Sequence, residues 1–184
     1  MPHKRELLPT GERILRGVEI LCRADERVVR RWVERRHPSL EERWLVELMT
    51  RVDISAREFG WDIFHALDME PTVRAYVREA RQWLTAFQCW DYRAECGLAL
   101  GGDVAVLRAR QTTYGDSWYR RGGVGAYMVG IRKWDRMRVQ MDTHGGLLRA
   151  LEAQLWDPAG VLDDLLDLRR YMYLWQAGAR CGLR

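Results

Sequence analysis

Apolar residues recur at steps of three and four along almost the whole chain, and the period-two alternation of a half-buried strand is essentially absent. In a helix, such steps place the apolar side chains on one stripe, which has to be buried against neighbouring helices. A chain of 184 residues is long enough to bury a substantial core in this way. The sequence therefore predicts an all-α protein that folds as a compact multi-helix bundle.

Prolines and capping residues mark where these helices begin and end. Pro38 ends the first helix, the capping box that starts at Ser39 opens the second, and Pro71 suits the first turn of a longer one. Asp157 followed by Pro158 is an N-cap signal for the last helix. The predicted helices span about residues 11–36, 39–57, 61–67, 71–96, 104–111, 124–140, 147–156 and 158–177.

No linker divides the chain, so residues 1–184 are predicted to form a single helical domain in which residues 1–103 pack as an N-terminal helical layer. The four cysteines match neither a C-x-x-C metal knuckle nor a secreted disulfide framework, which favours a reducing cytoplasm. The first residues lack an apolar leader, and no 18 apolar residues run together, so a soluble protein is expected. The net charge of +4 is compatible with an anionic ligand without demanding one.

Two carboxylates of the last predicted helix fall on the apolar face, where an unpaired charge is costly. At 100° per residue, Asp164, Asp167 and Tyr171 share one narrow arc of this helix. Asp163 points about 100° away and is expected to face solvent. Two like charges on adjacent turns repel each other unless a cation lies between them, which favours a bound metal ion.

Acids of other predicted helices also lie on apolar faces. Asp135 lies in the apolar arc of the helix at 124–140, so we expect it to be buried. Asp91, Glu95 and Asp25 also continue the apolar stripes of their helices. Carboxylates aimed into a helical bundle commonly hold hard divalent cations such as Mg²⁺, which prefer oxygen ligands. The pattern therefore predicts a magnesium site.

The alternative is that each acid pairs with one of the many arginines. Asp135 would then pair with Arg138, Asp167 with Arg170, and Asp25 with a residue of a neighbouring helix. For any single acid this ion-pair interpretation is favoured, and only the aligned pair in the last helix favours the metal.

Residues 114–125 form a loop rich in glycine, arginine and aromatic residues directly before a helix. Free amides at a helix N-terminus bind phosphate, and Arg120 and Arg121 can add bidentate contacts. Tyr114 or Trp118 can stack on a base. A turn that requires a positive φ explains the glycines equally well.

The commonest catalytic motifs are absent from the sequence. Its four histidines show no H-E-x-x-H spacing, so zinc chemistry is not expected. No G-x-S-x-G elbow, Walker A loop or dinucleotide fingerprint occurs, which removes the commonest nucleophile and P-loop classes.

Three short blocks carry a family resemblance: Tyr114–Trp118, Arg132–Arg136 and Asp163–Tyr171. Together they resemble the nucleotide-modification-associated domain of phage and prophage proteins, over roughly residues 104–175. The last block is also similar to the second metal motif of the all-α nucleoside triphosphate pyrophosphohydrolases of the MazG and dimeric dUTPase type. On that pattern Asp164 and Asp167 would be metal ligands and Tyr171 a neighbour of the site.

Those pyrophosphohydrolases also present a Glu-x-x-Glu pair on the preceding helix, where this chain has only Asp135. Two interpretations follow from this departure. Asp91 and Glu95 complete the metal site from another helix, or the domain binds nucleotides without hydrolysing them.

The resulting hypothesis is a metal-dependent hydrolase that splits a (deoxy)nucleoside triphosphate and releases pyrophosphate, in phage nucleotide metabolism or DNA base modification within a bacterial host. Asp135, Asp164 and Asp167 would be the catalytic residues, holding Mg²⁺, or alternatively Mn²⁺, which activates a water. The resemblance also implies a homo-oligomer. The expected substrate-binding residues are Tyr114, Trp118, Arg120, Arg121, Lys133, Arg136 and Tyr171.

The alternative function is a non-catalytic helical module. It would bind a nucleotide, a nucleic acid or a modification-enzyme partner through its arginine-rich faces. Such a module would show steep salt dependence and no turnover, whereas the hydrolase would need Mg²⁺ and yield pyrophosphate.

Overall fold

The computed structural model describes residues 10–35, 75, 78, 79, 81–83, 85, 101–115, 117, 120, 122–154 and 159–182. These residues fold into α-helices and turns, and no strand occurs among them. The prediction of an all-α protein is confirmed. Within this described part of the chain, no helix is long and apolar enough to cross a membrane.

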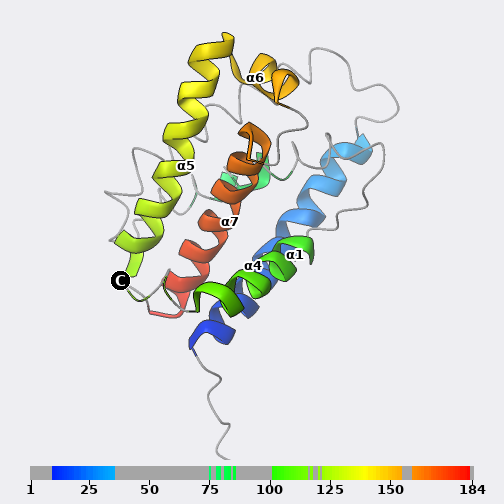
Figure 1. The fold of residues 1–184 in the computed structure, drawn as a ribbon. Coiled ribbons are helices and arrows are strands. Elements are labelled where there is room, and N and C mark those ends of the chain that lie inside the picture. Colours follow the sequence, from blue (N-terminus) through cyan, green and yellow to red (C-terminus); the bar gives the residue numbers. More distant parts are fainter. Residues whose placement is uncertain are drawn as a thin grey trace, which may run out of the picture.

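The helices with described bounds are α1 (Thr10–Arg35), α4 (Gly101–Tyr114), α5 (Gly122–His144), α6 (Leu147–Ala153) and α7 (Val161–Arg180) (Figure 1). The described residues between 75 and 85 are helical as well, within the helix predicted at 71–96. The helices predicted at 39–57 and 61–67 lie outside the described residues.

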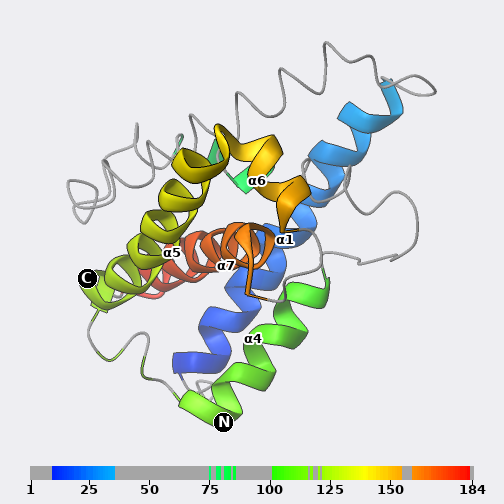
Figure 2. The same ribbon diagram turned by 45° about the horizontal axis from the view of Figure 1, so that its top comes forward.

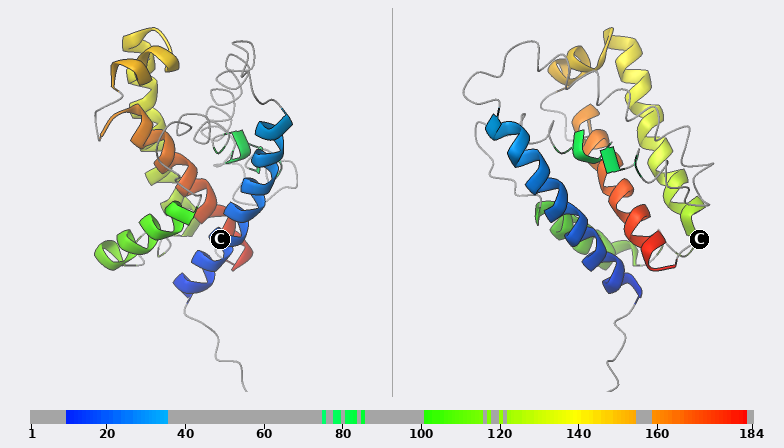
Figure 3. Two further views of the ribbon diagram at one scale, coloured as in Figure 1. Left: turned by 90° about the vertical axis from the view of Figure 1, so that its right-hand side faces the viewer. Right: turned by 180° about the vertical axis from the view of Figure 1, so that it is seen from behind.

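α7 lies in the middle of the bundle, with α5 on one side of it and α1 on the other (Figure 1, Figure 3). α4 packs against α1, and α6 packs against α5 towards the opposite end (Figure 2). Because neighbours cover α7 from several sides, most of its residues are buried, and four of these are charged: Asp164, Asp167, Arg169 and Arg170. A buried charge needs a partner of opposite charge, so the helices around α7 have to supply counter-charges to its buried residues.

A cluster of buried apolar residues lies where α1, α4 and α7 meet. It contains Ile14, Leu15, Val18, Leu21, Cys22, Val104, Leu107, Tyr173, Leu174 and Ala177. Gly17 brings α1 and α7 close together, since a Cβ atom at this position would lie 3.0 Å from the Cβ of Ala177. Cys22 and Cys181 are free thiols.

A buried group of polar side chains joins α1 and α7 to Arg81 and Thr85. The Tyr173 hydroxyl donates to Asp25 Oδ2 at 2.9 Å and lies 3.3 Å from Thr85 Oγ1. Arg81 Nε lies 3.5 Å from Asp25 Oδ2, so Asp25 does pair with a neighbouring helix. Burial raises the pKa of Asp25, while the charge of Arg81 and the hydrogen bond from Tyr173 oppose that shift.

Most helix boundaries lie within a few residues of the predicted ones. α1 agrees with the predicted range 11–36 to within one residue at each end. α5 is longer than predicted, because the glycines at its start join the first turn and the helix continues to His144, directly before Gly145, which adopts a φ of 75°. α7 begins at Val161 with Gly160 as its N-cap, later than the predicted start at Pro158.

Candidate functional site

The two aligned acids of α7 are buried together, as the sequence predicted. The side chains of Asp164 and Asp167 are only 4% and 1% exposed. Asp163, which was expected to face solvent, is half-buried beside them. The chemistry of the site depends on which groups neutralise these carboxylates.

Three cationic side chains from three helices surround Asp167. Arg110 of α4 and Arg170 of α7 each donate through Nη1 to Oδ1 at 2.8 Å. Lys133 of α5 places its Nζ 2.7 Å from Oδ2. Burial raises the pKa of Asp167, but these three donors outweigh burial and hold the pKa below its usual value. The carboxylate is therefore a fixed anion at the meeting point of α4, α5 and α7.

Asp164 is held mainly by Arg136 of α5, which donates through Nε to Oδ2 at 3.0 Å and through Nη2 to Oδ1. Lys133 Nζ also lies 3.3 Å from Asp164 Oδ1 and 3.7 Å from Asp163 Oδ2. Partial burial lowers the pKa of Lys133, but its hydrogen bond to Asp167 and the nearby acidic charges raise the pKa above its usual value. Lys133 is thus a permanently charged ammonium group at neutral pH.

The charged group extends to Asp103, which lies in the first turn of α4 and is 2% exposed. Arg170 donates through Nε to Asp103 at 3.1 Å, and Arg169 donates to the same carboxylate through Nη2. Arg170 therefore bridges Asp103 and Asp167, linking α4 to α7. Arg169 is fully buried, and its Nε and Nη1 atoms have no hydrogen-bond partner among the residues that the structure describes.

The expectation that Asp135 is buried is wrong. Its side chain is 56% exposed, and an arginine of its own helix, Arg138, lies 4.0 Å away. α5 buries Trp134 and Met137, and position 135 lies about 100° round the helix from Trp134, on the solvent side. Met128, which belonged to the predicted apolar arc, is 52% exposed. Asp135 therefore does not converge with the acids of α7.

These carboxylates do not fit a divalent cation. Mg²⁺ requires free oxygen lone pairs, whereas the oxygens of Asp164 and Asp167 already accept or face guanidinium and ammonium N–H groups. No group of three or more His, Cys, Asp or Glu side chains within the described ranges is placed to hold a metal ion. Asp91 and Glu95 lie outside those ranges. For the acid pair of α7, the ion-pair interpretation matches the structure.

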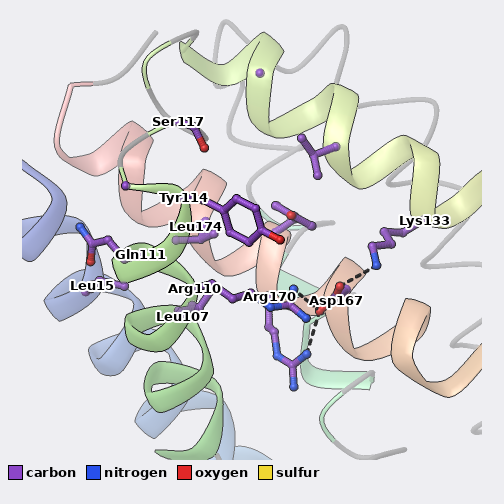
Figure 4. A pocket seen from close by; sticks show the side chains of 14 residues that line it. Leu15, Leu107, Arg110, Gln111, Tyr114, Ser117, Lys133, Asp167, Arg170 and Leu174 are labelled. Atoms are coloured by element: carbon purple, nitrogen blue, oxygen red, sulfur yellow. Dashed lines mark hydrogen bonds and ion pairs between the residues drawn. The ribbon is translucent and has the colours of Figure 1, made fainter. Parts of the chain in front are cut away.

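A pocket of about 480 Å³ opens beside Asp167, between α4, α5 and α7, with one wall from α1 (Figure 4). Its apolar lining comes from Leu15, Leu107, Val129 and Leu174. Its charged lining comes from Arg110, Lys133, Asp167 and Arg170. Tyr114 projects from the end of α4 over the cavity, towards the side where the three cations surround Asp167 (Figure 4). The pocket is therefore apolar at one end and cationic at the other.

Three of the predicted substrate-binding residues, Tyr114, Lys133 and Tyr171, line this pocket together. Arg136 instead holds Asp164. Arg120 is exposed in the turn before α5, whereas Trp118 and Arg121 lie outside the described residues. The structure thus brings the predicted aromatic and lysine residues together from three separate helices.

Arg110 was not predicted from the sequence, and Arg170 was predicted only as a partner of Asp167. The signal for Arg110 was its i,i+4 spacing to Tyr114, which puts both side chains on one face of α4. Burial raises the pKa of Tyr171, and the charge of Asp167 adds to that effect, so this phenol stays neutral at physiological pH.

No protein-family model, curated protein or solved structure matches this chain. The likeness to the phage nucleotide-modification domain therefore remains a prediction from three short motifs.

Proposed function

We propose that this chain binds a phosphate-bearing ligand with a flat ring, a nucleotide by chemical class, in the pocket beside Asp167, and that binding needs no divalent cation. The observation that supports it most strongly is the composition of this one cavity, where Arg110 and Lys133 lie opposite an apolar wall beneath Tyr114. A volume of about 480 Å³ falls within the range of small-molecule pockets.

The group of charged side chains beside the pocket carries a net positive charge. The connected charged group contains Arg110, Lys133, Arg136, Arg169 and Arg170 against Asp103, Asp163, Asp164 and Asp167, so five cations and four acids leave +1. The acid in the pocket wall is 1% exposed, whereas the side chain of Arg110 is 40% exposed and that of Lys133 is 18% exposed. An incoming group therefore meets N–H donors rather than carboxylate oxygens, which favours an anion.

Arg110 is the residue best placed to bind a phosphate. One of its five N–H donors is used on Asp167 at 2.8 Å, which fixes the guanidinium and leaves the remaining donors for a ligand. A planar fork of this kind forms paired hydrogen bonds to phosphate oxygens. Asp167 is a positioning residue in this proposal, because it holds Arg110, Lys133 and Arg170 together without meeting the ligand.

The apolar end suits a ring. Tyr114 is 68% exposed, which is unusual for a large aromatic side chain and leaves its face free for stacking. Leu107 and Leu174 line the wall near it, and Tyr171 adds a neutral hydroxyl. A base or another flat heterocycle would fill this end while its phosphate met the cations.

Hydrolysis of a triphosphate with release of pyrophosphate is the reaction that the motif resemblance implies. It would need Mg²⁺ on Asp164 and Asp167, whose oxygens are engaged by Arg136, Arg110 and Lys133. We derive no catalytic step from this arrangement, and the experiment below separates simple binding from turnover.

The test is calorimetric titration with deoxynucleoside mono- and triphosphates, nucleosides and inorganic pyrophosphate, in EDTA and again in Mg²⁺. Nucleotides should bind in EDTA, more tightly than either fragment. Arg110→Met should weaken nucleotide binding by about 10- to 100-fold, the value of one hydrogen bond to a charged group. Tyr114→Leu should weaken nucleotide binding but not pyrophosphate binding.

Arg108→Met is the matched control, since Arg108 lies on the same helix but faces Glu12 outside the pocket. Equal nucleotide affinity of Arg110→Met and Arg108→Met would contradict the proposal. Binding only in Mg²⁺, with pyrophosphate released, would instead support the metal-dependent hydrolase.

A further inference from the structure

The outward face of α1 is an arginine face that the pocket does not use. It carries seven exposed arginines: Arg13, Arg16, Arg23, Arg27, Arg30, Arg31 and Arg35. α1 lies on the far side of α7 from α5 (Figure 1, Figure 3). From Arg13 to Arg35 the face extends about 33 Å at 1.5 Å per residue.

Three of these arginines are partly neutralised by glutamates that recur every seven residues. Arg16, Arg23 and Arg30 each lie one turn after a glutamate and pair with it. The other four, Arg13, Arg27, Arg31 and Arg35, have no carboxylate partner among the residues that the structure describes. In its sequence, α1 has seven arginines against four glutamates and the buried Asp25, a net charge of +2.

Two of the unpaired guanidinium groups are held in a defined orientation. Arg31 Nε donates to the carbonyl oxygen of Arg27 at 3.1 Å, and Arg35 Nε donates to that of Arg31 at 3.0 Å. Anchoring through Nε lowers the entropy that each side chain loses when a ligand binds. Both side chains are exposed, and the surface between Ile20 and Arg31 forms a groove.

We propose that the arginine face of α1 binds the phosphate backbone of a nucleic acid. The seven arginines are spread along about 33 Å of one side of α1, a length close to one turn of duplex DNA, which is roughly 34–36 Å. Arginine forks pair with phosphate oxygens in two hydrogen bonds, and such contacts position a protein without reading sequence.

A membrane surface is the less favoured polyanion. Helices that lie in a bilayer interface insert their apolar face, whereas α1 buries Ile14, Val18 and Val29 inside the protein. Among the described residues of α1, Ile20 is the one large apolar side chain that is exposed. An acidic peptide would lack the regular charge spacing of a phosphate backbone along this length.

The test is fluorescence anisotropy of the full chain with labelled 20-base-pair DNA, single-stranded DNA and RNA duplex, across a salt series. Binding should weaken with salt at a slope of log K against log salt of about −4 to −6. The variant Arg27→Gln/Arg31→Gln/Arg35→Gln should bind more weakly and reduce that slope by about three. Gln keeps the helix propensity, so the circular dichroism and melting temperature should not change.

The matched control, Arg132→Gln/Arg138→Gln/Arg149→Gln, removes three exposed charges from α5 and α6 and should keep the wild-type slope. The proposal fails if the two triple variants bind alike, if none of the three nucleic acids binds at low salt, or if acidic vesicles or polyglutamate bind more tightly. The pocket is tested with free nucleotides and this surface with nucleic acids, so the two proposals can fail separately.

Discussion

Replacing Asp167 by Asn tests whether this carboxylate anchors cations or binds a metal. Asn keeps the size of the side chain but removes the charge that holds Arg110, Lys133 and Arg170 at 2.7–2.8 Å. Breaking a buried ion pair by removing one partner costs about 3–5 kcal/mol, because the other charges are left uncompensated. Asp135→Asn is the matched control, since its side chain is 56% exposed and should change stability by less than about 0.5 kcal/mol.

The assay is urea unfolding followed by far-UV circular dichroism at pH 7, with thermal melting as a second measurement. For a chain of this size, the expected loss lowers the melting temperature of Asp167→Asn by roughly 6–20 °C. A loss below about 1 kcal/mol would refute the anchoring argument. Stabilisation of the wild-type protein by about 10 mM Mg²⁺, absent in Asp167→Asn, would instead identify Asp167 as a metal ligand.

The pH dependence of the same pair provides an independent check. The folded pKa of Asp167 lies below its unfolded value of about 4, so its contribution to stability is complete above that pH. As the pH falls through the lower folded pKa, the carboxylate is protonated and the contribution disappears. The difference in unfolding free energy between wild type and Asp167→Asn should therefore shrink below about pH 4. A difference that stayed constant down to pH 2 would contradict this assignment.

Three further predictions concern the buried parts of α1 and α7. Tyr173→Phe removes the hydroxyl that donates to Asp25, and urea unfolding should show a loss of about 1–3 kcal/mol; an unchanged unfolding midpoint would contradict it. In Gly17→Leu, the new Cβ would lie 3.0 Å from the Cβ of Ala177, so the free energy of unfolding should fall by about 1–3 kcal/mol. An unaltered melting temperature would contradict the close packing of α1 against α7. Burial raises the pKa of the Cys22 thiol to about 12, so iodoacetamide at pH 8 should leave Cys22 unmodified in the folded protein, as measured by mass spectrometry. Rapid alkylation of Cys22 under these conditions would contradict its burial.

The sequence was sufficient to predict the helical class and the acid pair of α7. Asp164 and Asp167 could be placed together because they lie three residues apart on one helix, where the geometry is local. Asp135 was misplaced because α5 has apolar residues on both sides, and Met128 and Val139 turn out to be exposed. Which side of such a helix is buried depends on its neighbours, and its own residues do not decide it.

The cations of the site were harder to predict than its acids. Arg110, Lys133 and Arg170 come from three helices, and their meeting point depends on how those helices pack. A carboxylate on an apolar face indicates that some positive charge lies nearby, but a metal ion and an arginine satisfy it equally well. The sequence therefore located the buried acids, whereas the side chains that pair with them depend on how the helices pack.

Ion pairs at two points along α4 fix where Tyr114 lies. Asp103 lies at one end of α4 and Tyr114 at the other, about 16 Å away at 1.5 Å per residue. Arg170 donates to Asp103 at 3.1 Å, and Arg110, one turn before Tyr114, donates to Asp167 at 2.8 Å. A tilt of α4 that widened the pocket would have to stretch both contacts, so the charged group that offers N–H donors to a ligand also sets the height of the aromatic ring above it.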